Sequence, residues 1–208
     1  MTYLDSFNIF NCSINQTKIK LNPLEYFIPN GLNEKSVIMI SSKEDSGKTL
    51  LAINLAIENP ESLFLYIDTT FKLKADIIPN NMYIFSSNDI NDIKEYINSL
   101  NKNNIDFIMI DSLNNLKLNE TETEYYIEFN KELMNLIQIC SDINCCLILF
   151  NGLNMNNNPF GLNLKNIKQI SLLLNIIDFN FDNKELTFKV LKNKFGPKNN
   201  YSIKMRYF

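Results

Sequence analysis

Residues 42 to 49 have the types and the spacing of a phosphate-binding loop. They read Ser-Lys-Glu-Asp-Ser-Gly-Lys-Thr, which is the pattern G-x-x-x-x-G-K-[ST] with a serine in place of the first glycine. In such a loop the backbone N–H groups face the phosphates, Lys48 neutralises β- and γ-phosphate charge, and the Thr49 hydroxyl binds Mg²⁺. Gly47 has no Cβ, so the backbone can approach the ligand closely. The pattern predicts a site for ATP and Mg²⁺ made of Ser42, Lys43, Glu44, Asp45, Ser46, Gly47, Lys48, Thr49 and Leu50.

A second motif favours this prediction over the simpler interpretation that the loop is an ordinary helix start. Residues Phe107–Ile110 are apolar and lead directly into Asp111. An aspartate at the end of a buried strand can hold Mg²⁺ through water, as the Walker B carboxylate of P-loop NTPases does. It follows the loop by about sixty residues, with a strand and a helix predicted between them. We therefore expect Thr49 and Asp111 to bind the metal, and Lys48 and Asp111 to act in catalysis.

The elements that must position these residues follow from the apolar pattern. Short, near-continuous apolar runs are typical of parallel strands buried on both faces, and one-sided apolar repeats are typical of helices. Strands are predicted at Val37–Ile40, Leu63–Ile67, Met82–Phe85, Phe107–Ile110 and Cys146–Phe150, and helices at Lys48–Glu58, Asp89–Leu100 and Glu122–Ile139. The C-terminal part predicts a strand meander at Gln169–Phe181, Glu185–Leu191 and Tyr201–Tyr207. This order predicts an α/β domain with a parallel sheet between layers of helices.

Composition excludes several kinds of chemistry. The 208 residues suit one domain, and the absence of histidine excludes histidine bases and histidine metal sites. The single arginine, Arg206, excludes arginine-rich phosphate clamps. The four cysteines include no C-x-x-C pair, so the zinc patterns fail as well. A net charge of -3 excludes a polycation that coats nucleic acid by charge alone.

The sequence carries no signal for secretion or membrane insertion. The N-terminus lacks a signal-peptide pattern, and no apolar run reaches the ~20 residues that a membrane span needs. Cys145 and Cys146 lie in an apolar run, where free buried thiols are the usual case. These features predict a reduced, soluble, cytoplasmic protein with no membrane partner.

Several motifs together resemble those of the RecA-like recombinases, in the family's order, from about residue 23 to the end. Glu44–Thr49 resembles the family's E-S-S-G-K-T, Leu65–Thr70 its F-I-D-A-E, Ile108–Leu113 its V-V-D-S-V, and Leu147–Leu153 its L-I-F-I-N-Q-I. The resemblance implies a RecA-like P-loop NTPase core at residues 23–208, with a mostly parallel central sheet, helices on both faces and a C-terminal antiparallel strand meander. Residues 1–22 would be an N-terminal extension that docks on the adjacent subunit or, alternatively, adds a strand to the protomer's own sheet.

The resemblance also implies self-association into a filament or ring. Lys192-Asn193-Lys194 matches the family's K-N-K, whose lysines reach the ATP site of the neighbouring subunit. Lys192 and Lys194 are therefore candidate catalytic residues, and two ordinary solvated lysines are the alternative. The longer stretch K-N-K-F-G-P, residues 192–197, also resembles the K-N-R-x-G-P of DnaB-type replicative helicases.

A DNA contact is implied by the stretch Pro159-Phe160-Gly161, which falls where the family's second DNA-binding loop carries Phe-Gly. Phe160, Gly161 and the nearby Lys165 are candidate contacts to single-stranded DNA, through base stacking and charge. An ordinary surface loop with one packed phenylalanine explains the same residues, so both interpretations stay open.

Three positions depart from the family's pattern. The family's catalytic glutamate aligns with Thr70, and threonine accepts no proton near neutral pH. The sensor glutamine that links the γ-phosphate to the DNA loop aligns with Gly152, and the first loop glycine is Ser42. These departures predict ATP binding with slow hydrolysis, and a displaced carboxylate such as Glu44 is an alternative base.

Three functions are compatible with these features. The first is an ATP-binding recombination or repair protein that acts on single-stranded DNA as an oligomer. The second is a catalytically weakened regulatory paralogue that binds a partner recombinase, and the third is a DnaB-type helicase-like motor. The single arginine disfavours a small P-loop kinase, and the absence of an N-K-x-D guanine motif disfavours a GTPase.

Overall fold

The computed structural model of the protein describes residues 19–73, 77–100, 105–117, 125–153, 159 and 166–206. Within them, the strands are β1 (Val37–Ser42), β2 (Phe64–Asp68), β3 (Met82–Ser86), β4 (Phe107–Asp111), β5 (Cys146–Gly152), β6 (Ile170–Asn180), β7 (Glu185–Asn193) and β8 (Tyr201–Lys204). The helices are α1 (Lys48–Ile57), α2 (Ile90–Ser99) and α3 (Tyr125–Asp142), with short 3₁₀ turns η1 (Leu24–Tyr26) and η3 (Leu113–Asn115). Every strand and helix predicted from the sequence has a counterpart whose ends differ by at most three residues.

The eight strands form one sheet in the order β3-β2-β4-β5-β1-β6-β7-β8. Neighbours from β3 to β6 pair in parallel, and β7 and β8 continue the sheet antiparallel. Because parallel strands bring their carboxyl ends to one edge, Ser42 at the end of β1 lies beside Gly152 of β5. At the same edge, Asp68 of β2 lies beside Asp111 of β4. This edge therefore holds the phosphate-type loop and Asp111, two of the sites for which the sequence predicts chemistry.

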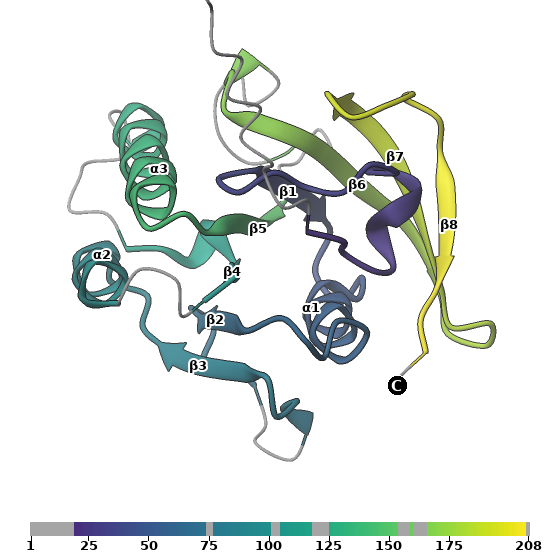
Figure 1. The fold of residues 1–208 in the computed structure, drawn as a ribbon, viewed down its shortest axis with the longest axis horizontal. Helices are drawn as coiled ribbons and strands as arrows, with labels where there is room; N and C mark the ends of the chain where they lie inside the picture. The colour runs from purple at the N-terminus through teal and green to yellow at the C-terminus, as the bar shows by residue number, and fades with distance from the viewer. Residues whose placement is uncertain are drawn as a thin grey trace, which may run out of the picture.

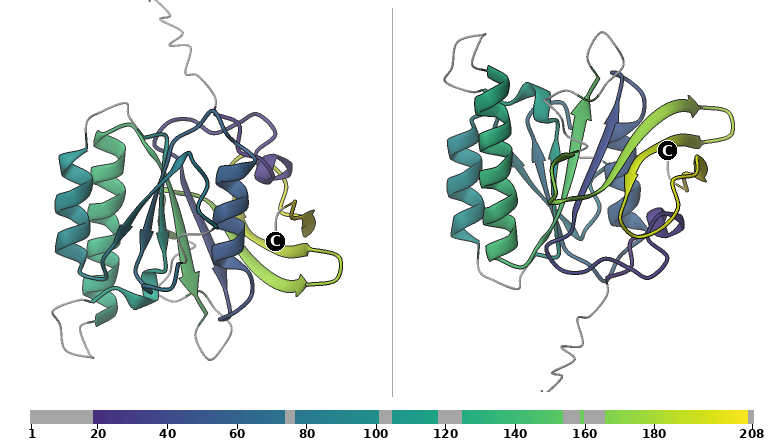
Figure 2. Two further views of the ribbon diagram at one scale, coloured as in Figure 1. Left: turned by 90° about the horizontal axis from the view of Figure 1, so that it is seen from below. Right: turned by 90° about the horizontal axis from the view of Figure 1, so that it is seen from above.

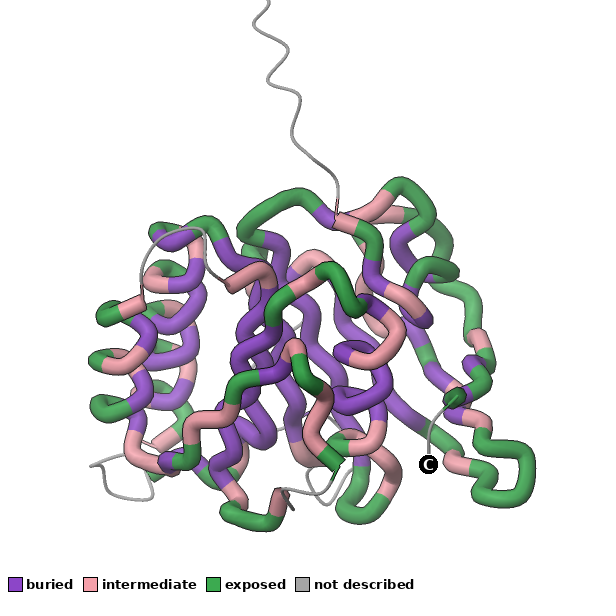
Figure 3. Tube along the Cα trace, turned by 60° about the horizontal axis from the view of Figure 1, so that its bottom comes forward, coloured by how far each residue is buried: buried purple, intermediate pink, exposed green. Residues whose placement is uncertain are grey.

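Helices pack on the two sides of the sheet, with α2 and α3 together on one face and α1 on the other (Figures 1 and 2). Alternate residues of each strand enter two apolar cores. Ile38 and Ile40 of β1 face α1, and Val37 and Met39 face the opposite core, which α2 and α3 cover. The central parallel strands β1, β2, β4 and β5 are therefore buried on both faces (Figure 3), as their continuous apolar runs require, whereas the edge strand β3 is only partly buried.

The segment before β1 packs against the core on the α1 side. Leu21, Leu24 and Phe27 are fully buried in that core. Asn59, just beyond α1, fixes the segment because its side chain donates to the Asn22 carbonyl at 2.8 Å and accepts from the Asn22 N–H at 3.1 Å. The described part of the predicted N-terminal extension, residues 19–22, thus joins the chain's own core, and residues 1–18 lie outside the described residues.

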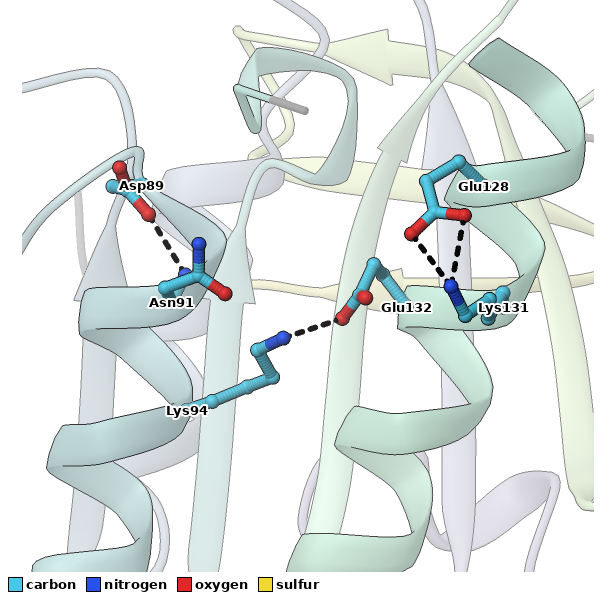
Figure 4. Close-up of polar contacts among 6 residues, drawn as sticks. All are labelled: Asp89, Asn91, Lys94, Glu128, Lys131 and Glu132. Carbon is cyan, nitrogen blue, oxygen red and sulfur yellow. Dashed lines mark hydrogen bonds and ion pairs between the residues drawn. The ribbon is translucent and has the colours of Figure 1, made fainter. Parts of the chain in front are cut away.

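A partly buried ion pair joins the two helices on the other face (Figure 4). Lys94 of α2 donates to Glu132 of α3 at 2.8 Å. Burial alone would raise the pKa of Glu132, but the hydrogen bond and charge of Lys94 lower it overall. The start of α2 is capped, because the Asp89 carboxylate accepts the N–H of Asn91 at 2.8 Å.

The predicted RecA-like fold class is wrong. The described residues hold only three α-helices against eight strands of one mixed sheet, so the chain is helix-poor and strand-rich where a RecA-like core is helix-rich. The motifs that carry the resemblance are loops and strand ends, and such motifs do not determine how many helices lie between the strands. Strands β6 to β8 follow one another without a helix, and most of β7 and all of β8 alternate buried and more exposed residues, which favours antiparallel pairing.

Three of the four cysteines lie in the described part of the chain. Cys140, Cys145 and Cys146 are free and buried, and burial raises the pKa of Cys145 and Cys146 to about 12. Such thiols are poor nucleophiles and poor metal ligands at neutral pH. In the part of the chain that the structure describes, no helix combines the length and the apolarity needed to cross a lipid bilayer.

Candidate functional site

The phosphate-type loop connects the end of β1 to the start of α1. Gly47 is the residue before the helix and has a φ of 88°, in the left-handed region that glycine adopts most easily. A side chain at this position would also meet the β6–β7 hairpin, since a Cβ on Gly47 would lie 3.2 Å from Leu186 and 3.5 Å from Phe179. Both the backbone angle and the close approach therefore require glycine here. The loop brings the helix N-terminus, with its unpaired N–H groups, to the carboxyl edge of the sheet.

Lys48 folds back onto the start of the loop. Its ammonium donates to the Ser42 hydroxyl at 3.0 Å and to the Lys43 carbonyl at 2.8 Å. Ser42, which replaces the usual glycine, is fully buried, so its side chain is a structural part of the loop. Burial lowers the pKa of Lys48, and the carboxylates of Asp111 and Glu44 offset only part of that effect. Both present partners of the ammonium, the Ser42 hydroxyl and the Lys43 carbonyl, are neutral. A phosphate that entered the loop would give the ammonium a charged partner in their place.

Asp111, at the end of β4, accepts hydrogen bonds from the start of α1 and from β2. The Thr49 hydroxyl donates to Oδ2 of Asp111 at 2.5 Å, although the two residues are 62 positions apart. The buried hydroxyl of Tyr66 in β2 donates to the same oxygen at 2.6 Å. Burial and the Asp111 carboxylate raise the pKa of Tyr66, so it stays protonated and continues to donate. These two donors fix the orientation of the carboxylate.

Tyr66 was not among the residues predicted to form the site. It interrupts the apolar run of β2, and a buried tyrosine hydroxyl normally has a hydrogen-bond partner. The polar atom in an otherwise apolar strand was the available signal. The partner itself could not be predicted, because it lies on the neighbouring strand.

The turn after β2 places Thr70 in the same region. The Asp68 carboxylate accepts from the Thr70 N–H, the Thr70 hydroxyl and the Phe71 N–H on one oxygen, and from the Leu73 N–H on the other. Thr70 is therefore a hydrogen-bond donor to Asp68. It offers no carboxylate to the cavity beside it.

These elements enclose one cavity of about 440 Å³ at the carboxyl edge of the sheet. Its walls come from the loop, from the turn after β2 and from the ends of β4 and β5. The lining includes Glu44, Asp45, Lys48, Thr49, Thr69, Thr70, Asp111, Asn114 and Gly152. Lys48, Thr49 and Asp111 thus come together as the sequence predicts, whereas Lys43 and Ser46 line a separate hollow on the other side of the loop.

Lys192 and Lys194 do not join this cavity within one chain. Lys192 of β7 lies level with Leu173 of β6, which in turn lies level with Met39 of β1. The backbone of Lys192 thus lies about 10 Å from the Ser42 end of β1 along the strand direction, and about 10 Å from β1 across the sheet. Both ammonium groups donate to backbone carbonyls of the segment before β6, Lys192 to Ile167 and Lys194 to Lys168.

The predicted DNA contacts Phe160, Gly161 and Lys165 lie outside the described residues. The loop that carries them begins beside the cavity, because Gly152 lines it and Leu153 forms a bridge with Pro159. Those three contacts stay predictions.

Comparison with known proteins adds no family to these observations. No protein-family model matches the sequence, and no curated protein matches it significantly.

Proposed function

We propose that the protein binds Mg²⁺-ATP in the cavity at the carboxyl edge of its sheet and hydrolyses it slowly. One observation carries this proposal: Thr49 of a phosphate-type loop donates to Asp111 of a separate strand, in a cavity that Lys48 also lines. The helix N-terminus and Lys48 suit the phosphates, and the hydroxyl and carboxylate oxygens suit a hard cation.

The residues present fit a magnesium ion held together with nucleotide. The proton of the Thr49 hydroxyl points to Asp111, which leaves the lone pairs of that oxygen for a metal. The described residues contain no cluster of three His, Cys, Asp or Glu that could hold a metal alone. Mg²⁺ commonly keeps waters and binds phosphates through one or two protein oxygens, so Thr49 and Asp111 suffice. When bound, the ion would neutralise negative charge on the phosphates.

Slow hydrolysis is supported by the side chains around the expected position of the attacking water. Thr70 donates its hydroxyl to Asp68, and Asp111 is already held by two donors. Glu44 and Asp45 are the remaining carboxylates among the described residues of the cavity wall. A well-placed general base usually raises the rate on the order of 10²–10⁴-fold. This cavity lacks that contribution unless Glu44 or Asp45 acts as the base.

The biological setting of this activity is a further part of the proposal. The motif resemblance supports action on single-stranded DNA in the cytoplasm as an oligomer, in recombination or repair. A regulatory protein that binds nucleotide and a partner recombinase is the second candidate. It is favoured by the Asp68–Thr70 hydrogen bond and by Gly152, where no side chain can report on bound nucleotide.

Binding of ATP is expected to depend on Mg²⁺ and on the Thr49 hydroxyl. Calorimetric titration of the wild type should show ATP binding in the presence of Mg²⁺. The affinity for ATP should fall by about 10-fold or more when EDTA removes the ion, since the phosphates lose a charged partner. Thr49→Val should remove most of this magnesium dependence, and Thr49→Ser, which keeps the hydroxyl, should retain it. A wild type that binds no ATP with Mg²⁺ would refute the proposed function.

Removal of both Lys192 and Lys194 is expected to weaken assembly and leave the monomer folded. Lys194 is exposed and Lys192 is half-buried, and the loss of their hydrogen bonds to carbonyls should cost the monomer about 0.5–1.5 kcal/mol each, whereas lysines that face a neighbour's phosphates would also lose that contact. Light scattering with a non-hydrolysable ATP analogue and single-stranded DNA would compare wild type with Lys192→Ala, Lys194→Ala. The matched control is Lys198→Ala, Lys204→Ala, which removes two exposed lysines elsewhere.

Two results would change this assignment. A wild type that stays monomeric with the nucleotide analogue and DNA would favour the regulatory candidate. Assembly that is equally strong in the Lys192, Lys194 double variant would remove these two lysines from the site.

A further inference from the structure

We infer that Asn114 is the side chain that contacts the terminal phosphate of the bound nucleotide and so distinguishes a triphosphate from a diphosphate. The inference rests on the proposed function. Asn114 belongs to η3, the 3₁₀ turn that follows Asp111 and Ser112, and it lines the nucleotide cavity.

The position of Asn114 is fixed relative to the phosphate-type loop through Gly152. A Cβ on Gly152 would lie 3.1 Å from both Cγ and Oδ1 of Asn114, and 3.3 Å from its Nδ2. The carboxamide therefore lies over the backbone of Gly152, in space that any other residue there would occupy. Gly152 itself pairs with Ser42, where the loop begins, and adjacent strands are about 4.8 Å apart. Asn114 thus lies at the same edge of the sheet as the loop, over the end of the strand that neighbours Ser42.

The orientation of the carboxamide leaves its donor side available. Its Oδ1 accepts from the Ser112 hydroxyl at 2.7 Å, and the Asn115 amide donates to that same hydroxyl at 3.1 Å. The Nδ2 group of Asn114 has no hydrogen-bond partner among the described residues, and it is not one of the enclosed unpaired atoms. It is therefore open to the cavity that Asn114 lines.

The chemistry of the cavity explains which ligand group this donor would meet. Phosphate oxygens accept hydrogen bonds, and the described cavity lining outside the loop holds Lys72 and three asparagines but no arginine to supply them. Arg206 lies elsewhere, near Glu58. A neutral amide that donates to a charged oxygen is among the stronger hydrogen bonds. Lys48 and Thr49 would hold the phosphates from the loop, and Asn114 would then add a donor to the last phosphate from η3.

The test measures the affinities of a non-hydrolysable ATP analogue and of ADP, both with Mg²⁺, by calorimetric titration. The wild type should bind the triphosphate more tightly than ADP. Asn114→Ala should weaken triphosphate binding by about 10-fold, the effect of one lost hydrogen bond to a charged group, and leave ADP binding unchanged. Asn114→Asp keeps the shape and the bond from Ser112 but adds negative charge, so it should lower triphosphate affinity further.

A second pair of variants tests the position of Asn114. Gly152→Ala should lower the affinity for the triphosphate because its methyl group displaces the carboxamide. In the Asn114→Ala background the same change should have no further effect, because the displaced group is gone. Additive losses in the double variant would overturn the inference.

The outcomes also separate this inference from the proposed function. A wild type that binds neither nucleotide refutes the proposed function. A wild type that binds both, together with Asn114→Ala and Asn114→Asp variants whose preference for triphosphate over ADP is unchanged, refutes the role of Asn114 alone.

Discussion

Replacement of Lys48 by alanine is expected to weaken Mg²⁺-ATP binding by about 10- to 150-fold, equivalent to about 1.5–3 kcal/mol for a hydrogen bond to a charged group. The ammonium is held at the entrance of the loop by Ser42 and the Lys43 carbonyl, so it is oriented before the nucleotide arrives. It is also the first residue of α1, so it lies at the helix N-terminus, where the proposed nucleotide would place its phosphates. Calorimetric titration of the two proteins with Mg²⁺-ATP measures the loss directly.

The control for Lys48→Ala is Lys20→Ala, which removes the same charge from an exposed position outside the cavity. Its affinity for Mg²⁺-ATP should equal that of the wild type. The pH dependence offers a second check. Because burial lowers the pKa of Lys48 in the free protein, the affinity should begin to fall with rising pH earlier than an ordinary lysine would allow. Unchanged affinity in Lys48→Ala would place the nucleotide elsewhere.

Replacement of Thr70 by glutamate is expected to raise ATP turnover, by at most about 10²–10⁴-fold, because it adds a general base beside the cavity. The change gives up the hydrogen bond from the Thr70 hydroxyl to Asp68 and brings a second carboxylate near it. Asp68 keeps its backbone donors from Thr70, Phe71 and Leu73, so the turn itself is expected to persist. Steady-state phosphate release measures the turnover.

Thr70→Gln is the matched control, since glutamine has the size of glutamate but accepts no proton near neutral pH. Only the glutamate variant should gain activity, and the gain should disappear below the pKa of the new carboxyl group. Equal rates for the two variants would show that base catalysis does not limit turnover. A fast wild type would instead point to Glu44 or Asp45 as the base.

The parts of this protein that the sequence determined by itself are local. The glycine before Lys48, the apolar run before Asp111 and the capping Asp89 each define a turn or an element end within a few residues. Backbone conformation depends strongly on such neighbours, so the strand and helix positions, the phosphate-type loop and Lys48, Thr49 and Asp111 could be predicted. The number of helices in the fold could not be taken from these motifs, and the predicted fold class was wrong for that reason.

The parts that only the tertiary structure decided are contacts between residues far apart in the chain. The bond from Thr49 to Asp111, the anchoring of Asp111 by Tyr66 and the placement of Asn114 over Gly152 all depend on which strands are neighbours. Strand order is set by the burial of apolar faces over the whole sheet, and no short stretch of sequence contains that information. The motif of Lys192 and Lys194 predicts a contact with a neighbouring subunit. It could not predict that, within the folded chain, their ammonium groups donate to the carbonyls of Ile167 and Lys168.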